Sequence, residues 1–331
     1  MSSAIRFAHP GPPDVLHLVQ VDRPAPGPHD VRIEVAAAGV NNADLLERRG
    51  HYPVPPNAPP GLGLEVAGII TAVGGEVTSW RLGDQVCALV AGGGYATEAI
   101  APAAQVMPIP TGLTMIEAAA LPEVACTVYS NLAMIAGLTA GQSVLIHGAG
   151  GGIGSFAIQW ADAIGARVIT TAGSGAKTQA ARDLGAMEAV NYRTDDFVAA
   201  TLDATDGRGV DAILDIVGTT YLRRNMECLA DDGHLVIIGG SVGPVTFDLW
   251  DLQSRRASIS ATLLRGRPAR QKAAIVAGVT RDVLPLVEAG KIRAIVDTVF
   301  PLAEASVAHE LLESGRTVGK VVLETSRHQP W

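Results

Sequence analysis

The sequence predicts an α/β protein of two domains, one of them built on a doubly wound parallel sheet. Its 331 residues exceed what a single hydrophobic core usually organises. Hydrophobic residues make up 48% of the chain and aromatic residues only 4%, a composition typical of aliphatic cores between helices and a parallel sheet. From residue 143 onward, strand-like and helix-like segments alternate, as right-handed β-α-β crossovers require.

The first part of the chain, to about residue 123, has a different pattern. Short strand-like segments at 31–37, 65–73 and 84–90 are separated by prolines and glycines, and a run of three glycines follows at 92–94. Strands interrupted this often predict irregular, mostly antiparallel β structure with long loops. Loops of that kind often carry functional sites.

The second part begins with helical patterns at 116–121 and 124–136. We expect strands at 143–147, 167–171, 189–191, 212–216, 235–239 and 258–264, with helices such as 153–164 and 177–184 between them. After residue 267 the pattern predicts helices at 269–277, 283–288 and 302–313 and strands at 294–300 and 320–323. We expect this last section to return to the first domain.

Charge and cysteine content exclude several classes. The net charge of −8 argues against a nucleic-acid binder, which needs clustered Lys and Arg to displace phosphate counterions. Cys87, Cys126 and Cys228 are far apart and unpaired in sequence, so we expect buried thiols and neither a disulfide framework nor a metal site. Residues 1–13 do not resemble a signal peptide, and no apolar run approaches about 20 residues, so we expect a soluble cytoplasmic protein without membrane contact.

A glycine-rich loop directly follows the apolar segment 143–147 and precedes a helix. The frame Ala149, Gly151 and Gly154, with Gly152 and Ile153 between, matches a dinucleotide fingerprint whose first glycine is replaced by alanine. Glycines at such a turn let backbone amides approach a pyrophosphate at the helix N-terminus. The loop predicts a Rossmann cofactor site; the alternative is a flexible surface loop.

The end of the next strand indicates which nicotinamide cofactor is used. NAD-binding folds usually place Asp or Glu there to bind the ribose hydroxyls, but this chain has Ala172 and Gly173, followed by Ser174 and Lys177. A 2′-phosphate can accept hydrogen bonds from the Ser174 hydroxyl and the Lys177 ammonium, so NADPH is favoured over NADH. The alternative is that Ser174 only caps the next helix and Lys177 is solvated.

The chain resembles the quinone oxidoreductase branch of the medium-chain dehydrogenase/reductase superfamily, and most closely the tumour-suppressor-inducible quinone reductase group. The resemblance extends over almost the whole chain. It is carried, in order, by Asn41-Asn42-Ala43-Asp44-Leu45, Gly63-Leu64-Glu65-Val66-Ala67-Gly68, Ala118-Ala119-Ala120-Leu121-Pro122-Glu123, the glycine loop, Thr171-Ala172-Gly173-Ser174, Asn191-Tyr192, Asp215-Ile216-Val217-Gly218 and Gly319-Lys320-Val321-Val322.

The resemblance implies a GroES-like, mostly β catalytic domain from residues 1–124 and 266–331, and a Rossmann NADPH-binding domain from residues 125–265. It implies that Asn41 lies beside the nicotinamide, that Thr127 lies near the diphosphate, and that Tyr192 joins Ser174 and Lys177 around the adenosine phosphate. The other implied cofactor contacts are Val217, Gly218, Gly239, Gly240, Ser241, Leu263, Leu264, Arg265, Gly319 and Lys320. Tyr192 could instead be a half-buried tyrosine at a strand end.

Zinc-dependent members of the superfamily hold their catalytic metal through a Cys at the position of Asn41 and a His at the position of Leu64. Both ligands are absent here, and no cysteine lies between Cys87 and Cys126 to form a structural zinc lobe. The resemblance therefore implies a zinc-independent enzyme with no metal site. We expect Glu65 to form a salt bridge or hydrogen bond.

Without a Lewis acid the substrate must be reactive in itself, as quinones are. Tyr52 lies in the loop that overhangs the substrate in this family, and its phenol, like the Asn41 amide, could donate a hydrogen bond to a forming oxyanion. The alternative for Tyr52 is a packing residue in a proline-rich lid.

Two other functions stay open. An enoyl reductase acting on unsaturated ketones, aldehydes or thioesters would use the same cofactor, and the basic segment 265–272 would then be the candidate to receive a coenzyme A handle. A non-catalytic NADPH-binding sensor would share the same glycine loop. We also expect a homodimer, because segment 258–264 should form an unprotected sheet edge.

Overall fold

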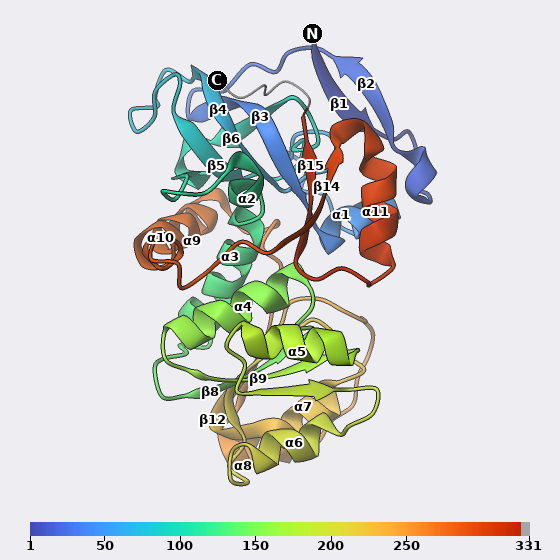
Figure 1. Ribbon diagram of the computed structural model, residues 1–331, viewed down its shortest axis with the longest axis vertical. Coiled ribbons are helices and arrows are strands. Elements are labelled where there is room, and N and C mark those ends of the chain that lie inside the picture. Colours follow the sequence, from blue (N-terminus) through green and yellow to red (C-terminus); the bar gives the residue numbers. More distant parts are fainter. Residues whose placement is uncertain (326–331) are drawn as a thin grey trace. The chain divides into compact units, whose positions relative to one another are not determined.

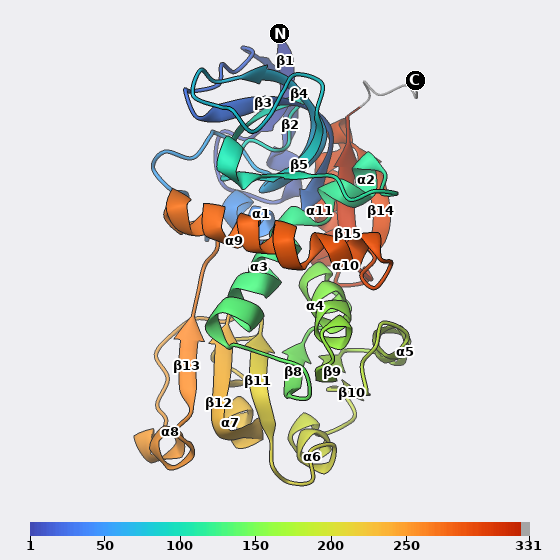
Figure 2. The same cartoon turned by 90° about the vertical axis from the view of Figure 1, so that its left-hand side faces the viewer.

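The computed structural model describes residues 1–325, and the chain divides into two compact units (Figures 1 and 2). Unit 1 comprises Met1–Cys126, Arg265–Glu288 and the described residues from Ala294 onward, and unit 2 comprises Thr127–Leu264 and Ala289–Arg293. Residues 326–331, part of the predicted catalytic domain, lie outside the described residues. The late chain section returns to unit 1, as expected, except for five residues, Ala289–Arg293.

Unit 1 is built on a seven-stranded sheet in the order β14-β15-β3-β4-β5-β7, with β6 also paired to β3. All of its strand pairs are antiparallel except β14 with β15, so the predicted mostly antiparallel β structure is confirmed. Its strands are β3 (Asp30–Val40), β4 (Glu65–Val73), β5 (Gln85–Leu89), β6 (Glu98–Pro102), β7 (Val106–Pro108), β14 (Val296–Pro301) and β15 (Lys320–Glu324). A separate hairpin, β1 (Ser2–Arg6) and β2 (His17–Val21), was not predicted.

The helices around this sheet are mostly short. They are α1 (Asn42–Arg48), α2 (Met115–Ala119), α3 (Pro122–Val128), α9 (Ala269–Asp282), α10 (Leu284–Glu288) and α11 (Ala305–Glu313). Val31, Ile33 and Val35 alternate with less buried residues along β3 and enter the core, the period-two pattern of a strand with one face buried. Ala305 and Ala308 of α11 close the same core.

Unit 2 is a six-stranded, fully parallel sheet in the order β10-β9-β8-β11-β12-β13. Helices α4 and α5 cover one face and α6 and α7 the other (Figure 1), so the predicted doubly wound sheet is confirmed. The strands are β8 (Ser143–His147), β9 (Arg167–Ala172), β10 (Glu188–Asn191), β11 (Val210–Asp215), β12 (Leu229–Ile237) and β13 (Ser258–Ala261); the helices are α4 (Gly152–Ala163), α5 (Gly175–Asp183), α6 (Phe197–Asp203), α7 (Leu222–Cys228) and α8 (Leu249–Arg255).

This topology locates the binding edge of unit 2. The chain runs from β8 outward to β9 and β10, then returns to β11 on the other side of β8. In open parallel sheets, ligands bind beyond the carboxyl ends of the strands where the order reverses in this way. The glycine loop that follows β8 lies at that edge.

Two predicted elements are corrected. The helix expected at 124–136 is divided into α3 and a π-helical segment, Tyr129–Ile135. The Asn131 side chain donates to the Thr127 carbonyl, which would accept the Asn131 backbone N–H in a regular α-helix. The strand expected at 258–264 ends at Ala261. It does lie at the edge of the sheet, as expected.

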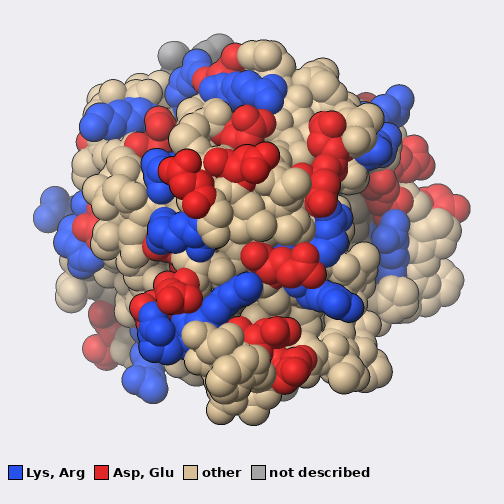
Figure 3. Space-filling view, turned by 90° about the horizontal axis from the view of Figure 1, so that it is seen from below, with Lys and Arg blue, Asp and Glu red and all other residues tan. Residues whose placement is uncertain are grey.

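The surface carries charges of both signs. On the face shown in Figure 3, Lys and Arg side chains are interspersed with Asp and Glu, and neither sign forms a continuous stripe. Among the helices of residues 1–325, none combines the length and apolar character needed to cross a membrane.

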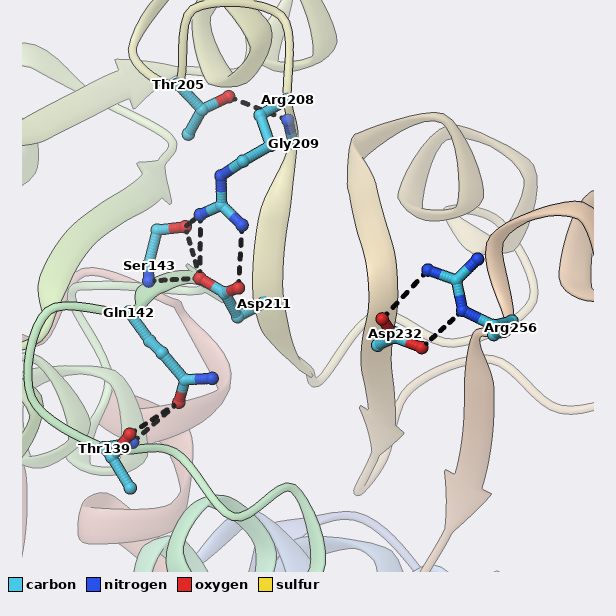
Figure 4. A network of polar contacts seen from close by, with 9 residues as sticks. All are labelled: Thr139, Gln142, Ser143, Thr205, Arg208, Gly209, Asp211, Asp232 and Arg256. Atoms are coloured by element: carbon cyan, nitrogen blue, oxygen red, sulfur yellow. Dashed lines mark hydrogen bonds and ion pairs between the residues drawn. The ribbon is translucent and has the colours of Figure 1, made fainter.

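A polar brace holds the opposite, amino-terminal edge of the unit 2 sheet (Figure 4). Asp211, at the start of β11, accepts hydrogen bonds from the Ser143 backbone N–H at 2.7 Å and from its hydroxyl at 3.0 Å. The Arg208 guanidinium donates to both oxygens of the same carboxylate, at 2.8 and 2.9 Å. Arg256 binds Asp232 in the same two-pronged manner. The two central strands, β8 and β11, are therefore fixed in register at this end.

The brace predicts a pH-dependent contribution to stability. The Arg208 guanidinium and the Ser143 N–H lower the pKa of Asp211 from 3.8 to about 2. An acid whose folded-state pKa is depressed stabilises the fold above its unfolded pKa, and this contribution disappears as pH falls through about 2. Allowing for solvent screening, we expect Asp211→Asn to lower the free energy of unfolding by about 1 kcal/mol at pH 7. Urea unfolding of the variant and the parent at pH 7 and near pH 2.5 checks this; a difference that does not shrink at low pH contradicts it.

Candidate functional site

The glycine loop of unit 2 forms a backbone cradle at the end of β8. The Gly148 and Ala149 N–H groups donate to the Thr171 carbonyl, and the Gly151 N–H turns back to the Gly148 carbonyl at 3.1 Å. Gly154 in the first turn of α4 packs so closely that a Cβ there would lie 2.2 Å from the Gly148 oxygen. Gly151, the N-cap of α4, offers no side chain to the helix N-terminus. No N-cap side chain therefore competes with an anion for the first backbone N–H groups of α4, which is what an anion site at a helix N-terminus requires.

Beyond the cradle, the structure brings together the residues predicted to bind a 2′-phosphate. Ser174 is the N-cap of α5, and its hydroxyl accepts the Lys177 N–H at 3.4 Å. The Tyr192 hydroxyl lies over Gly173, 2.6 Å from where a Cβ would be, and the Lys177 side chain passes over Gly150 in the glycine loop. The sequence stretch 173–177 carries no carboxylate at this strand end. Ser174 therefore caps α5, as the alternative interpretation predicts. It does so at a position beside Lys177 and Tyr192.

Thr127, predicted to contact the diphosphate, is buried and has an unusual environment. Its hydroxyl has no hydrogen-bond partner within residues 1–325. Its carbonyl, in contrast, accepts from the Asn131 amide at 2.7 Å and from the Ser130 hydroxyl at 3.2 Å. A buried hydroxyl without a partner is costly, by about 1–3 kcal/mol, unless a ligand or water supplies one. The orphaned hydroxyl fits a bound cofactor.

The predicted contacts 217–218 and 239–241 lie in two adjoining loops. Ser241 connects them, because its N–H and hydroxyl both donate to the Val217 carbonyl, at 2.9 and 3.0 Å. Gly218 has φ of +80°, and a Cβ there would lie 2.3 Å from the Ser241 oxygen. The two loops, which follow the carboxyl ends of β11 and β12, are therefore held together by these hydrogen bonds.

Two residues that support this edge were not predicted as site residues. The buried Asp215 carboxylate accepts from the Val217 and Gly218 N–H groups and from Asn225, which shapes the loop after β11. The Asn225 side-chain oxygen in turn accepts a hydrogen bond from His147 Nε2 at 2.8 Å. Nε2 must therefore carry the proton, and Nδ1 accepts from the Thr171 hydroxyl at 2.9 Å. Burial lowers the pKa of His147 to about 4, so this histidine is a neutral structural group.

In unit 1, Asn41 is joined to two buried charges. The Lys320 ammonium donates to the Asn41 side-chain oxygen at 2.5 Å, and Asn41 Nδ2 donates to Glu65 Oε1 at 2.9 Å. Lys320 and Glu65 also form an ion pair at 2.6 Å, which confirms the salt bridge expected of Glu65. The ammonium also donates to the Val40 carbonyl. An ammonium has three donors, and these three contacts, all within unit 1, can use each of them.

A second buried carboxylate, not predicted, lies at the start of α1. Asp44 accepts from the Asn41 and Gly63 N–H groups and from the Tyr95 hydroxyl. Tyr95 in turn meets His309 at 3.2 Å. Burial raises the pKa of Asp44 to about 6. The spacing Asn41-x-x-Asp44 is that of a capping box, and it is the sequence signal from which the position of Asp44 at the start of α1 could have been predicted.

Tyr52 and Arg265 lie together in unit 1. The Arg265 guanidinium carbon is 5.8 Å from the Tyr52 ring centroid, and the same side chain binds Glu47 and the Ala91 carbonyl. Arg265, predicted as the end of the cofactor domain, thus belongs to unit 1 and is buried there. Burial raises the pKa of Tyr52 to about 12, with Glu123 adding to the shift and Arg265 opposing it. The phenol is therefore a neutral hydrogen-bond donor at ordinary pH.

The remaining predicted cofactor contacts are Leu263, Leu264 and Gly319. Leu264 is buried and Leu263 exposed, and Gly319 precedes Lys320 with φ of +96°. In the basic segment 265–272, Arg265 and Lys272 are buried and Lys272 Nζ donates to the Arg265 carbonyl, whereas Arg270 is exposed. All three cysteines are buried thiols, as expected.

Comparisons with known proteins place the chain in a family. Residues 27–111 match the alcohol dehydrogenase GroES-like domain, and residues 184–323 match the zinc-binding dehydrogenase family. The quinone oxidoreductase of Pseudomonas aeruginosa is 34% identical over 98% of this chain and 99% of its own. The structure of Escherichia coli quinone oxidoreductase complexed with NADPH has a TM-score of 0.86 at 33% identity, covering 97% of this chain and 99% of that one. The structure of CurK enoyl reductase has a TM-score of 0.87 at 29% identity, covering 98% and 99%.

These matches establish the class. The chain belongs to the quinone oxidoreductase branch of the medium-chain dehydrogenase/reductase superfamily, whose GroES-like and Rossmann domains correspond to the sheet types of the two units. The predicted family and fold class are confirmed.

A metal does not fit the residues present, despite the family description. Asn41 and Leu64 stand where zinc-dependent relatives have ligands, and both ends of the Asn41 amide are already occupied. The Lys320 ammonium, itself a cation, lies against Glu65. Within the described chain, no group of three or more His, Cys, Asp and Glu side chains has the arrangement of a metal site. Among the three side chains of this cluster only Glu65 is a zinc ligand type, and its carboxylate is already paired with Lys320, so the ligand set of a zinc site is not present here.

Proposed function

We propose that the protein catalyses zinc-independent hydride transfer from NADPH to a quinone. The observation that carries the proposal is the Asn41 cluster, in which a buried Lys320–Glu65 ion pair and an asparagine stand where a catalytic metal would need ligands. Without a Lewis acid, the acceptor must delocalise the incoming charge itself, and quinones do so. The balanced reaction converts quinone, NADPH and one proton to hydroquinone and NADP⁺.

The cofactor proposal rests on unit 2. Ser174, Lys177 and Tyr192 gather at a strand end without a carboxylate, an arrangement suited to a 2′-phosphate. The orphaned Thr127 hydroxyl and the glycine cradle suit a diphosphate. A similar enzyme was crystallised with NADPH. The full proposed set is Asn41, Thr127, 151–154, Gly173, Ser174, Lys177, Tyr192, Val217, Gly218, 239–241, 263–265, Gly319 and Lys320, of which Lys320 acts through Asn41.

On the acceptor side we assign Tyr52 and Asn41. When bound, NADPH supplies the hydride. Tyr52 offers a neutral phenol next to Arg265. Within residues 1–325, the second N–H of the Asn41 amide has as its partner only the Gly39 carbonyl at 3.5 Å, the limit of a hydrogen bond. Both donors suit an oxygen that gains negative charge during reduction. Neither needs to transfer its own proton for this role.

An enoyl reductase is the second candidate, favoured by the likeness to CurK enoyl reductase. Single turnover with NADPH deuterated at the transferred position separates the two. Reduction of a C=C bond retains deuterium on the product carbon, whereas a hydroquinone carries its new hydrogens on oxygen and loses the label to water. We expect faster turnover with 1,2- and 1,4-quinones than with enones or enoyl thioesters. The reverse order, with deuterium retained on carbon, would replace the quinone by an enoyl substrate.

We also propose a homodimer formed through the outer edge of β13. Among the described strands, β13 pairs only with β12. Three exposed apolar residues lie in the adjoining segment and helix: Val242, Leu249 and Trp250. An open strand edge and an apolar surface both favour association with a second copy. Light scattering at micromolar concentration should give twice the chain mass of 34.2 kDa. A monomer under those conditions refutes the dimer.

A further inference from the structure

Lys320, Glu65 and Asn41 form a closed triangle of buried side chains in unit 1. Each member contacts both others: the ammonium to the carboxylate at 2.6 Å, the ammonium to the amide oxygen at 2.5 Å, and the amide nitrogen to the carboxylate at 2.9 Å. The side chains of Glu65 and Lys320 are 0% and 6% exposed. The second Glu65 oxygen accepts the Glu123 N–H at 2.9 Å, so the carboxylate has its own fixed orientation.

This triangle fixes which way the asparagine amide points. Oxygen and nitrogen of an amide are hard to distinguish by shape, but their partners decide the assignment. An ammonium can only donate, so it must face the Asn41 oxygen, and an ionised carboxylate can only accept, so it must face the Asn41 nitrogen. A flipped amide would place its N–H₂ against the Lys320 ammonium and its oxygen against the Glu65 carboxylate.

We propose that Lys320 is a positioning residue that keeps Asn41 a hydrogen-bond donor toward the acceptor substrate. The ammonium occupies the amide oxygen, so Asn41 can present only its remaining N–H. The site consequently selects substrates with an acceptor oxygen, such as a quinone or ketone carbonyl, and gains nothing from a substrate hydroxyl that would need to donate at this place. This inference rests on the proposed function for its substrate but on unit 1 alone for its geometry.

The orientation can be measured without turnover. In protein labelled with ¹⁵N-asparagine, the Asn41 side-chain NH₂ signal is identified by its absence in Asn41→Asp. We expect its two protons to be well separated in the parent protein, because one is held by Glu65 and the other is nearly free. In Lys320→Met, the amide can rotate, and we expect the pair to move and broaden. An Asn41 signal that is unchanged in Lys320→Met overturns the proposal.

Kinetics separate positioning from general loss of structure. Lys320→Met should lower kcat with a quinone by about 100-fold, as expected when an oxyanion donor is lost, and should change the Kd for NADPH by less than about tenfold, because Lys320 acts on the cofactor only through Asn41. Lys320→Arg keeps the cation and should recover a large part of the rate. Because Lys320→Met leaves a buried carboxylate without its cation, Lys320→Met with Glu65→Gln serves as the neutral variant and should fold but remain slow.

The matched control is Lys272→Met, which removes the other buried lysine of unit 1. Its ammonium contacts only the Arg265 carbonyl at 3.4 Å among the bonds of the described chain, so turnover should be retained. If the parent turns over quinone and the neutral double variant is as fast, the positioning role is wrong and the proposed function stands. If the parent itself reduces no carbonyl acceptor, the proposed function fails, and the NMR result alone decides the orientation.

Discussion

Replacing Ser174 with Asp is expected to weaken NADPH binding by about 100-fold, or about 2.7 kcal/mol, and to change NADH binding by less than about threefold. Ser174 lies with Lys177 and Tyr192 at the proposed 2′-phosphate site, and a carboxylate there repels a phosphate and removes a charge-assisted hydrogen bond. Aspartate is as good an N-cap as serine, so α5 keeps its cap and the fold is not at risk.

The measurement is the Kd of each cofactor by fluorescence titration. Ser174→Ala is the control, because it removes the hydroxyl without adding charge and should weaken NADPH by only about tenfold. Equal losses of NADPH and NADH in Ser174→Asp would show that the 2′-phosphate lies elsewhere.

The second large effect is expected for Tyr52→Phe, which should lower kcat with a quinone by about 10- to 100-fold and leave the Kd for NADPH unchanged. The phenylalanine ring keeps the contact with the Arg265 guanidinium and removes only the hydroxyl. Because the pKa of Tyr52 is raised to about 12, the parent phenol stays protonated and its contribution should not decline up to about pH 10. A variant as active as the parent would leave Tyr52 as a packing residue of its loop.

The elements best predicted from sequence are those governed by local pattern. The strands 143–147 and 65–73 were placed to the residue, because continuous apolar runs bounded by turns leave little choice. The hairpin β1–β2 was missed because β2 is largely exposed and so lacks alternation. The π-helical turn was missed because it arises from the Asn131 side chain binding a carbonyl, which hydrophobic periodicity does not record.

Part of the candidate site could be proposed from sequence. Ser174, Lys177 and Tyr192 were proposed through a missing acid and a resemblance, and they lie together where the neighbouring strands β9 and β10 end. The partnership of Asn41 with Lys320 was not predictable, because the two residues are 279 positions apart and meet only when β15 pairs with β3. Asp215 and Asn225 were missed for a different reason: they act by holding the loop after β11 in shape, which no sequence motif records.

We propose that this chain moves hydride from NADPH to a conjugated carbonyl without a metal. Chelator-treated protein, freed of zinc by dialysis and checked by elemental analysis, should oxidise NADPH with a 1,4-quinone at the same rate as untreated protein. Loss of activity that returns on adding zinc would contradict the claim. Tight NADPH binding without turnover on any quinone, enone or enoyl thioester would contradict it too, and would leave a cofactor-binding sensor in place of an enzyme.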